Sequence, residues 1–117
     1  GGFIFGVQEL ATAVQYGIGL VTVVFNNASY GNVLRDQHRL YQGREIGSTL
    51  TNPDFVKLAE SFGAAGYRAN TPAELKAALE KAFAQSGPAL IEVPIARGTE
   101  ASPWPFLHPN ARYGVLA

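Results

Sequence analysis

Two consecutive carboxamide side chains, Asn26 and Asn27, follow directly after the apolar segment Leu20–Phe25. The segment is short, continuous and rich in β-branched residues, which predicts a buried parallel strand. Open α/β sheets bind ligands at the carboxyl ends of their strands, and a carboxamide oxygen is a suitable ligand for Mg²⁺ or Ca²⁺. An isolated Asn-Asn pair more often only forms a turn, because asparagine tolerates left-handed backbone and forms Asx turns. The pair is therefore a candidate metal site whose meaning depends on its surroundings.

Two glycines at the start of the chain, Gly1 and Gly2, form the second candidate site. They precede a helix predicted over residues 5–16, and 24 residues separate Gly1 from Asn26. Glycine lets a phosphate approach the backbone closely, and the N–H groups at the N-terminus of a helix favour anions. Gly-Gly alone is usually only a turn, so a phosphate contact here depends on the asparagine motif as well.

The two histidines of the chain, His38 and His108, are its natural acid–base groups near neutral pH. His38 lies in a long predicted loop behind the asparagines, where it either contacts a substrate or is a solvated neighbour of Asp36 and Arg39. The sequence shows no Ser-His-Asp or Cys-His arrangement, and it contains no cysteine. We therefore assign no catalytic residue from the sequence.

Composition restricts the class of protein. The chain has 117 residues, of which 47% are hydrophobic, and its formal net charge is zero, which predicts one domain with a real core. The neutral balance argues against a nucleic-acid partner and a polybasic membrane surface, and no apolar stretch approaches the ~20 residues of a membrane span. The absence of cysteine fits a cytoplasmic protein. Methionine is absent even at position 1, so we expect a fragment of a longer protein.

The elements that must position these residues alternate between helices and strands. Helices are predicted at 5–16, 52–62 and 71–86, and strands at 20–25, 65–69 and 89–93. This order predicts an α/β fold with a parallel sheet flanked by helices. Behind the first strand, residues 26–50 show no clean period, which predicts a long loop with at most one short helix.

Local signals indicate where two of the helices begin and end. Asn52 is the predicted N-cap of the second helix, with Pro53 at its first position and Gly63 behind its last. Thr71 and Glu74 have the spacing of a capping box at the start of the third helix.

The C-terminal segment 94–117 differs in composition from the rest of the chain. It holds four of the seven prolines and the bulky anchors Trp104 and Phe106, which predicts an extended tail lying on a surface. His108 is expected to make only local hydrogen bonds there. We therefore divide the chain into an α/β domain at 1–93 and a proline-rich tail at 94–117.

Each predicted helix carries an apolar face, and together these faces exceed what three strands can cover. We therefore expect self-association, through edge pairing or an exchanged element, that buries Leu20–Phe25 or the first helix. The three faces consist of Val7, Leu10 and Val14, of Phe55, Leu58 and Phe62, and of Leu75, Leu79 and Phe83.

The two motifs and their separation resemble the signature of thiamine diphosphate (ThDP) enzymes: Gly-Asp-Gly, about two dozen residues, then Asn-Asn. Gly1 matches the last glycine of the first element, and the Gly and Asp before it are expected just upstream. The helix within Gly6–Gly17 and the pattern Gly31-x-Val33-x-x-x-Gln37 resemble those of acetolactate synthases and related 2-oxoacid-processing enzymes. The resemblance covers nearly the whole chain and implies the C-terminal, diphosphate-binding domain of such an enzyme.

The resemblance implies a site for ThDP and Mg²⁺. The implied metal ligands are the upstream Asp, the side chain of Asn27 and the backbone carbonyl of Ser29. The implied cofactor contacts besides these two residues are Gly1, Gly2, Tyr30 and Gly31. The pyrimidine-binding domain of a neighbouring subunit would complete the site, so we expect a homo-oligomer and an isolated chain that is inactive.

The same resemblance leaves the reaction open between a carboligase and a decarboxylase acting on a 2-oxoacid. Val33 stands where pyruvate-type decarboxylases tend to carry Glu, which favours a synthase, whereas synthases often show Trp where this chain has Asp36. Glu9 is not taken as the Glu that activates the cofactor, because the family carries that residue in a different domain.

Three alternatives to the synthase remain. One is a lyase of the benzoylformate or pyruvate decarboxylase type, and another is a truncated, non-catalytic module for folding and association. The third is a Rossmann-type nucleotide site, which is disfavoured because Gly1, Gly2 and Gly6 do not match Gly-x-Gly-x-x-Gly.

Overall fold

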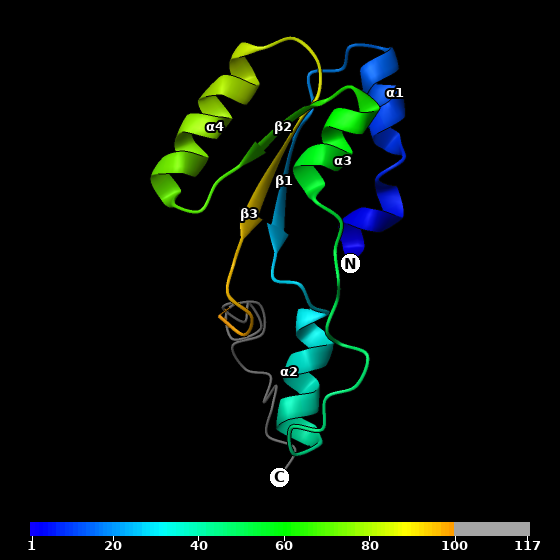
Figure 1. Cartoon of the computed structure of the whole chain (residues 1–117), viewed down its shortest axis with the longest axis vertical. Helices are drawn as coiled ribbons and strands as arrows, with labels where there is room; N and C mark the ends of the chain where they lie inside the picture. The colour runs from blue at the N-terminus through cyan, green and yellow to red at the C-terminus, as the bar shows by residue number, and fades with distance from the viewer. Residues whose placement is uncertain (100–117) are drawn as a thin grey trace, which may run out of the picture.

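The computed structural model describes residues 1–99 as an α/β domain (Figure 1). Its elements are, in chain order, the 3₁₀ helix η1 (Gly2–Gly6), α1 (Glu9–Gln15), β1 (Val21–Asn26), α2 (Gly31–Leu40), α3 (Phe55–Phe62), β2 (Ala65–Arg68), α4 (Pro72–Ala84) and β3 (Ala89–Pro94). Helices and strands alternate as the sequence predicts, and α2 is an additional helix within the segment predicted as a loop.

The three strands form one parallel sheet in the order β1-β3-β2. Val21 of β1 lies opposite Ala89 of β3, and Asn26 lies opposite Pro94 at the other end of the pair. Ala65 of β2 lies opposite Ala89 from the other side. The carboxyl ends of the strands therefore point to one edge of the sheet, and the predicted fold class, a parallel sheet flanked by helices, is confirmed.

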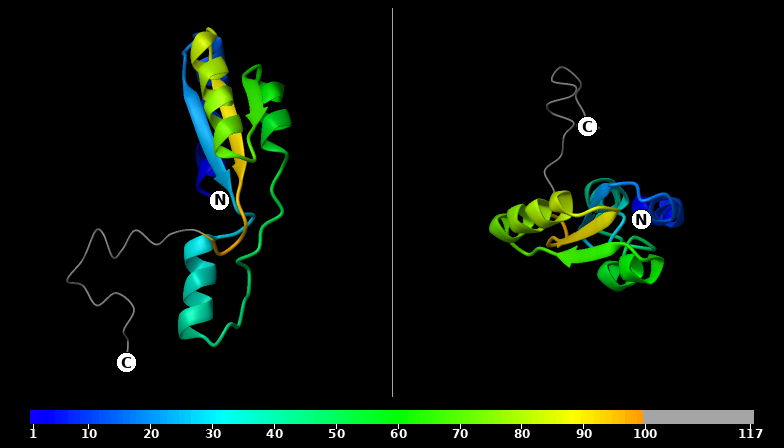
Figure 2. Two further views of the ribbon diagram at one scale, coloured as in Figure 1. Left: turned by 90° about the vertical axis from the view of Figure 1, so that its left-hand side faces the viewer. Right: turned by 90° about the horizontal axis from the view of Figure 1, so that it is seen from above.

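Helices cover both faces of the sheet (Figure 2). α1 and α3 pack on one face, where Leu90 of β3 is fully buried against Phe55 and Leu10. α4 packs on the opposite face, where Ile91 is fully buried against Ala78 and Ala82. Neighbouring residues of a strand point to opposite faces, so the central strand β3 supplies both cores.

The start of α4 confirms the predicted cap, because the Thr71 hydroxyl accepts the N–H of Glu74 at 3.1 Å. The buried side of α4 differs in part from the prediction. The small side chains Ala78 and Ala82 bring the helix close to the sheet, whereas Phe83 is 71% exposed. Phe83 follows Ala82 by one position, which turns it about 100° away from the packed face.

The helix predicted over residues 5–16 is divided into η1 and α1. Glycine weakens a helix interior, and Gly6 stands at the end of η1, two residues before the N-cap of α1 at Gln8. The α-helical part is therefore seven residues long and begins at Glu9. The predicted α-helix N-terminus behind Gly1 and Gly2 is a 3₁₀ turn instead.

The start of α3 also differs from the prediction. The N-cap is Asp54, whose carboxylate accepts the N–H groups of Val56 and Lys57. Asn52, the predicted cap, donates its side-chain amide to Asn26. A tertiary partner for Asn52 thus replaces the local role that its position in the sequence indicates, and Gly63 ends the helix in a left-handed conformation as predicted.

β1 is less buried than its apolar sequence predicts. Val24 is buried, but Phe25 is 63% exposed and Leu20 is half-exposed. β1 stands at the edge of the sheet and pairs with β3 alone within residues 1–99. The outer edge and one face of β1 therefore present apolar side chains to the surface.

The segment between β1 and α3 leaves the sheet at the carboxyl ends of the strands and contains α2, which lies beyond those ends (Figures 1 and 2). The ten residues of α2 bury Leu34, while Val33 and Leu40 are half-exposed. The segment thus contains the one short helix that the prediction allowed, and the bounds of this helix come from the structure.

The predicted tail lies largely outside the described residues, and so do Trp104, Phe106 and His108, on which its prediction rests. Among the helices of residues 1–99, none has the length and apolar character needed to cross a membrane.

Candidate functional site

The site begins with a tight turn at the end of β1, built by the two asparagines. The side-chain oxygen of Asn26 accepts the N–H of Ala28, and that of Asn27 accepts the N–H of Ser29, both at 3.0 Å. These two successive Asx turns hold Ala28 at φ 51°, in the left-handed region. That conformation costs an alanine roughly 1–2 kcal/mol, so the side-chain hydrogen bonds fix a backbone that the chain does not prefer.

The end of the segment between β1 and α3 returns to this turn and is hydrogen-bonded to it. Ser29 pairs with Thr49 in an isolated antiparallel bridge. The two bonds of the bridge run from the Tyr30 N–H to the Ser48 carbonyl, at 2.8 Å, and from the Leu50 N–H to the Ala28 carbonyl, at 2.9 Å. The carbonyl of Ser29 itself takes no part in the bridge.

Ser29 is buried, as is Ser48 across the bridge, and neither hydroxyl has a hydrogen-bond partner among the described residues. Buried polar groups are normally paired with protein or with ordered water. Both hydroxyls come from the part of the chain that surrounds the asparagine turn.

A cavity of about 200 Å³ joins the asparagine turn to the start of the chain. Gly1 borders it and also lies against the ring of Tyr30, where an added Cβ would come within 2.4 Å of a ring carbon. Gly1 therefore leaves no room for a side chain, whereas Gly2 faces open space. The cavity is lined by Gly1, Gly2, Phe3, Val23, Val24, Phe25, Asn26, Asn27, Asn52 and Phe55.

The first turn of α2 adds hydrogen-bond donors next to the asparagines. The helix begins at Gly31, and its N-cap Tyr30 offers no side-chain hydrogen bond to the helix. The first N–H groups of an α-helix have no partner within the helix and carry its positive dipole end. Gly31 lies in the wall of a second cavity, so these donors begin beside open volume.

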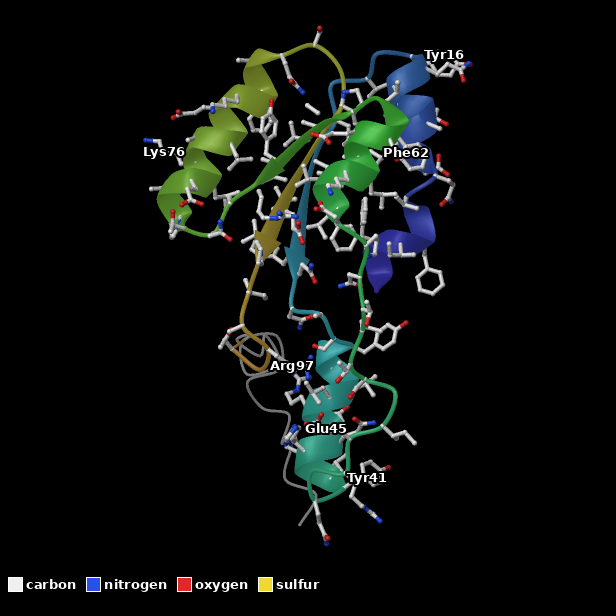
Figure 3. All side chains as sticks on the ribbon, viewed as in Figure 1. Tyr16, Tyr41, Glu45, Phe62, Lys76 and Arg97 are labelled. Atoms are coloured by element: carbon white, nitrogen blue, oxygen red, sulfur yellow. The ribbon has the colours of Figure 1, made fainter. Side chains whose placement is uncertain are left out.

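The second cavity, of about 650 Å³, lies between α2 and residues 97–98. Asn27 lines both cavities and so stands between them. Arg35 and Arg97 give the second cavity a basic wall, and Glu45 faces it from the segment behind α2; Figure 3 shows Arg97 and Glu45 beside that helix. His38, the predicted candidate for substrate contact, also borders this cavity and is paired with Glu45 at 2.5 Å.

A buried polar network is hydrogen-bonded to the asparagine turn, and the sequence analysis did not predict it. Glu92 of β3 is only 4% exposed. One carboxylate oxygen accepts the Asn26 amide at 2.7 Å, and the other accepts Arg68 of β2 at 2.9 Å. The available signal was the acidic residue in the apolar strand sequence Ala89–Pro94, because a charge in a central strand needs partners.

Arg68 connects this network to the start of α3. Its guanidinium also donates to Asp54 at 3.0 Å. The hydrogen bond to Glu92, followed by the one to Asp54, raises the pKa of Arg68 above its ordinary value. The backbone N–H of Lys57, followed by Arg68, lowers the pKa of Asp54. Both groups are therefore held in their charged forms at neutral pH.

Four of the predicted site residues border the two cavities, whereas Ser29 and Tyr30 are in the lining of neither. Gly1 and Gly2 line the smaller cavity, Asn27 lines both, and Gly31 opens α2. The N–H of Tyr30 is already bonded to Ser48, so its contribution to the site is the ring against Gly1.

At the asparagine turn itself, the available groups are neutral oxygens and N–H donors. Residues 1–99 contain no group of three or more His, Cys, Asp or Glu side chains that could hold a metal ion. A lone carboxamide and a carbonyl hold a hard cation only when an anionic ligand supplies further oxygens. A diphosphate at a glycine turn and a helix N-terminus meets that need. Fold and site together define an α/β domain with a polar site at the carboxyl ends of its parallel strands, and the resemblance implies a diphosphate-containing cofactor there.

Comparison with known families identifies that domain. Residues 1–93 match the family model "Thiamine pyrophosphate enzyme, C-terminal TPP binding domain", thiamine pyrophosphate being another name for ThDP. The chain belongs to this family, as its two motifs predict.

Acetolactate synthases are among the similar curated proteins. The acetolactate synthase large subunit of Haemophilus influenzae is 45% identical over 78 residues, which cover 66% of this chain and 14% of that protein. The probable acetolactate synthase large subunit of Methanocaldococcus jannaschii is 37% identical over 113 residues, which cover 96% of this chain and 19% of that protein. The predicted likeness to acetolactate synthases is confirmed.

Solved structures of similar fold include a thiamine diphosphate-dependent 4-hydroxybenzoylformate decarboxylase from Rhodococcus jostii RHA1. It matches with a TM-score of 0.76 and 32% identity over 84% of this chain and 19% of that one. A benzoylformate decarboxylase from Polynucleobacter necessarius matches with a TM-score of 0.74 and 32% identity, over 86% and 19%. The chain thus spans less than a fifth of the length of each of these relatives.

Proposed function

We propose that this domain holds the diphosphate of ThDP and its Mg²⁺ at the end of β1, as part of an acetolactate synthase-like enzyme. The carrying observation is that Asn27 lines both cavities while Gly1, with no room for a side chain, borders the smaller one. Gly1, Gly2 and the first turn of α2 would bind the diphosphate through backbone N–H groups.

The metal ligands in this proposal are the side-chain oxygen of Asn27 and the carbonyl of Ser29. The Asn27 oxygen accepts the N–H of Ser29, and a carboxamide oxygen is a neutral, hard ligand of the kind that Mg²⁺ prefers. The Ser29 carbonyl is outside the bridge to Thr49, whose bonds are made by neighbouring residues. The donor set therefore fits a hard cation that an anionic ligand brings with it.

The substrate class we propose is a 2-oxoacid. Bound ThDP supplies the electron sink for cleaving the bond between the carbonyl carbon and the carboxyl group. The chain's own residues bind and orient, and the basic wall of Arg35 and Arg97 suits the carboxylate of such a substrate. His38 lines the same cavity, paired with Glu45, where it can contact the substrate.

The proposed site is one half of a whole. The other half is the pyrimidine-binding domain of a neighbouring subunit in a homo-oligomeric enzyme, with no nucleic-acid or membrane partner. The exposed apolar side chains of β1 and of the first helices, among them Phe5 and Phe25, support association. The proposed compartment is the cytoplasm.

Light scattering of the 117-residue chain at tens of micromolar should show a dimer or larger species. A monodisperse monomer of 12.5 kDa would contradict the association.

The decisive experiment compares the two asparagines in the complete enzyme. Asn27→Ala should weaken Mg²⁺–ThDP binding by tens-fold or more, because a direct metal ligand is lost. Asn26→Ala should weaken it less, because Asn26 shapes the turn without touching the metal. Asn70→Ala, in the turn before α4, is the control. Equal effects of the first two variants, or a larger effect at Asn26, would show that the ligand is misassigned.

The 117 residues expressed alone give a complementary test. We expect no tight binding of Mg²⁺–ThDP, because the two protein oxygens are neutral and compete poorly with the hydration shell of Mg²⁺. The chain would then be inactive alone and act only in folding and association. Calorimetry that gives a low-micromolar dissociation constant, or a ThDP-dependent rise in melting temperature, would contradict this expectation.

A decarboxylase is the second candidate function. The likeness to two aryl-2-oxoacid decarboxylases in the structural comparison favours it, while Val33, half-exposed on α2, stands where the resemblance to pyruvate-type decarboxylases would require a Glu. Product analysis with pyruvate separates the two. A carboligase releases a coupled hydroxy-oxoacid, whereas a lyase releases only the aldehyde and CO₂.

A further inference from the structure

We propose that Glu92 is a positioning residue for the metal-ligand turn, acting through the side chain of Asn26. The inference rests on the proposed function, because it assigns the turn of Asn27 and Ser29 as the ligand segment. It adds a residue that neither the resemblance nor the comparisons assign. The structural observation is a continuous chain of hydrogen bonds from a buried carboxylate to the backbone of that turn.

The first link fixes the orientation of the Asn26 amide. Its nitrogen donates to Glu92 at 2.7 Å, and its oxygen accepts from the Ala28 N–H at 3.0 Å and from the Asn52 side chain at 2.8 Å. A flipped amide would place a nitrogen against two donors and an oxygen against a carboxylate. The carboxylate of Glu92 therefore determines which atom of Asn26 faces the turn.

The second link carries that orientation to the ligands. The Asn26 oxygen holds the N–H of Ala28, whose left-handed backbone separates Asn27 from Ser29. Without this acceptor the left-handed residue loses its support, and the two ligand oxygens lose their fixed separation. The Asn27 side chain closes the next turn in the same manner, so the ligand segment is a series of two turns that starts from Asn26.

The third link holds the carboxylate in place. Glu92 is buried in the central strand and accepts Arg68 on its other oxygen at 2.9 Å, and Arg68 is in turn bonded to Asp54. A buried carboxylate needs such partners. The network thus joins β2, β3 and the start of α3 to the ligand turn.

Glu92→Gln tests the proposal at constant size. A Gln side chain presents one acceptor and one donor, so it fails either Asn26 or Arg68. Hydrogen exchange of the cofactor-free full chain should then accelerate at the Ala28 amide by tenfold or more, with unchanged rates at Ala78 and Ala82 in α4. Glu74→Gln, a carboxylate bonded to the turn before α4, is the matched control and should leave Ala28 unchanged.

A double variant separates positioning from general stability. In an Asn26→Ala background the Ala28 amide already exchanges fast, so Glu92→Gln should add no further acceleration there. An unchanged Ala28 rate in Glu92→Gln, or equal acceleration of Ala28, Ala78 and Ala82, would overturn the proposal. If Glu92→Gln does not fold, Asn26→Ala with the Glu92–Arg68 pair intact carries the test, and an unchanged Ala28 rate again overturns it.

The functional half is tested by Mg²⁺–ThDP affinity in the complete enzyme. Glu92→Gln should weaken binding about tenfold, and the effect should vanish in the Asn26→Ala background. A changed exchange rate with unchanged affinity would overturn the role toward the ligands. Failure of the unaltered enzyme to bind Mg²⁺–ThDP would instead refute the proposed function, and the exchange result would still decide whether Glu92 positions the turn.

Discussion

The sheet with its covering helices is stabilised in a different way from the excursion, the segment of residues 27–50 between β1 and α3. In the sheet, the central strand β3 is buried on both faces and its side chains pack into two cores. In the excursion, α2 buries Leu34 while Val33, Leu40 and Tyr41 are about half-exposed. The first region is held by apolar packing, and the second is held at its ends by hydrogen bonds. The difference teaches that the core which stabilises this domain lies in the first region, and that the proposed site lies where the two regions meet.

The largest expected effect is a contrast between two leucines. Leu90→Ala removes a fully buried side chain from the centre of the sheet and should lower the free energy of unfolding by roughly 2–5 kcal/mol. Leu40→Ala, at a half-exposed position of α2, should change it by about 0.5 kcal/mol or less. Urea denaturation of both variants measures the difference, and similar losses would break the comparison.

The second expected effect is a difference in local opening. Amides of α2 should exchange at least a hundredfold faster than those of Leu90 and Ile91, because the helix can open without disturbing either core. Binding of Mg²⁺–ThDP to the complete enzyme should slow exchange in the segment 28–50 and leave β3 unchanged. Exchange in α2 as slow as in β1 or β3 without cofactor would contradict this prediction.

The third effect is a modest dependence of stability on pH that arises where the two regions meet. The folded state lowers the pKa of Asp54 below its ordinary value of 3.8, chiefly through the Lys57 N–H and then through Arg68. A lowered pKa contributes stability that is present above pH 3.8 and is lost as the pH falls through the folded-state pKa. Asp54→Asn keeps an N-cap oxygen and should reduce this acid loss. Equal slopes of stability below pH 3.8 for both proteins would count against the assignment.

The smallest effect concerns the turn that begins the excursion. Ala28→Gly removes the cost of the left-handed backbone at φ 51°, which is roughly 1–2 kcal/mol for an alanine. It also gives the unfolded chain more conformational entropy, which favours the unfolded state by about 0.4–1 kcal/mol. The net result should be a gain of about 0.5 kcal/mol in the free energy of unfolding. The change is measured against Ala11→Gly in α1 as a helix control. A loss of stability in Ala28→Gly would contradict the prediction.

The sheet region could be predicted from the sequence because its signals are local. Thr71 caps α4 at the predicted position, and the β-branched run before Asn26 forms a strand. The errors there have tertiary causes. Asn52 bonds to Asn26 instead of capping α3, and Phe25 is exposed because β1 stands at the edge of the sheet.

The candidate site could be predicted in its residues but not in its support. Gly1 and Asn27 were identified by type and spacing, and the structure brings both to the smaller cavity. Glu92 could not be paired with Asn26 from the sequence, because the two are 66 positions apart and meet only through the register of β1 and β3. The bounds of α2 were not predicted, because the helix has only three apolar residues, Val33, Leu34 and Leu40, and buries one of them.

The hydrogen bonds that join the two ends of the excursion have a consequence for how this domain can change over evolutionary time. The two ends are joined by the bridge between Ser29 and Thr49 and by the bond between Asn26 and Asn52. The free-energy cost of closing a loop grows only slowly with its length. The stretch between these two connections can therefore lengthen, shorten or be exchanged without a change in the sheet. This segment can therefore vary in length and sequence while the sheet that carries it stays the same.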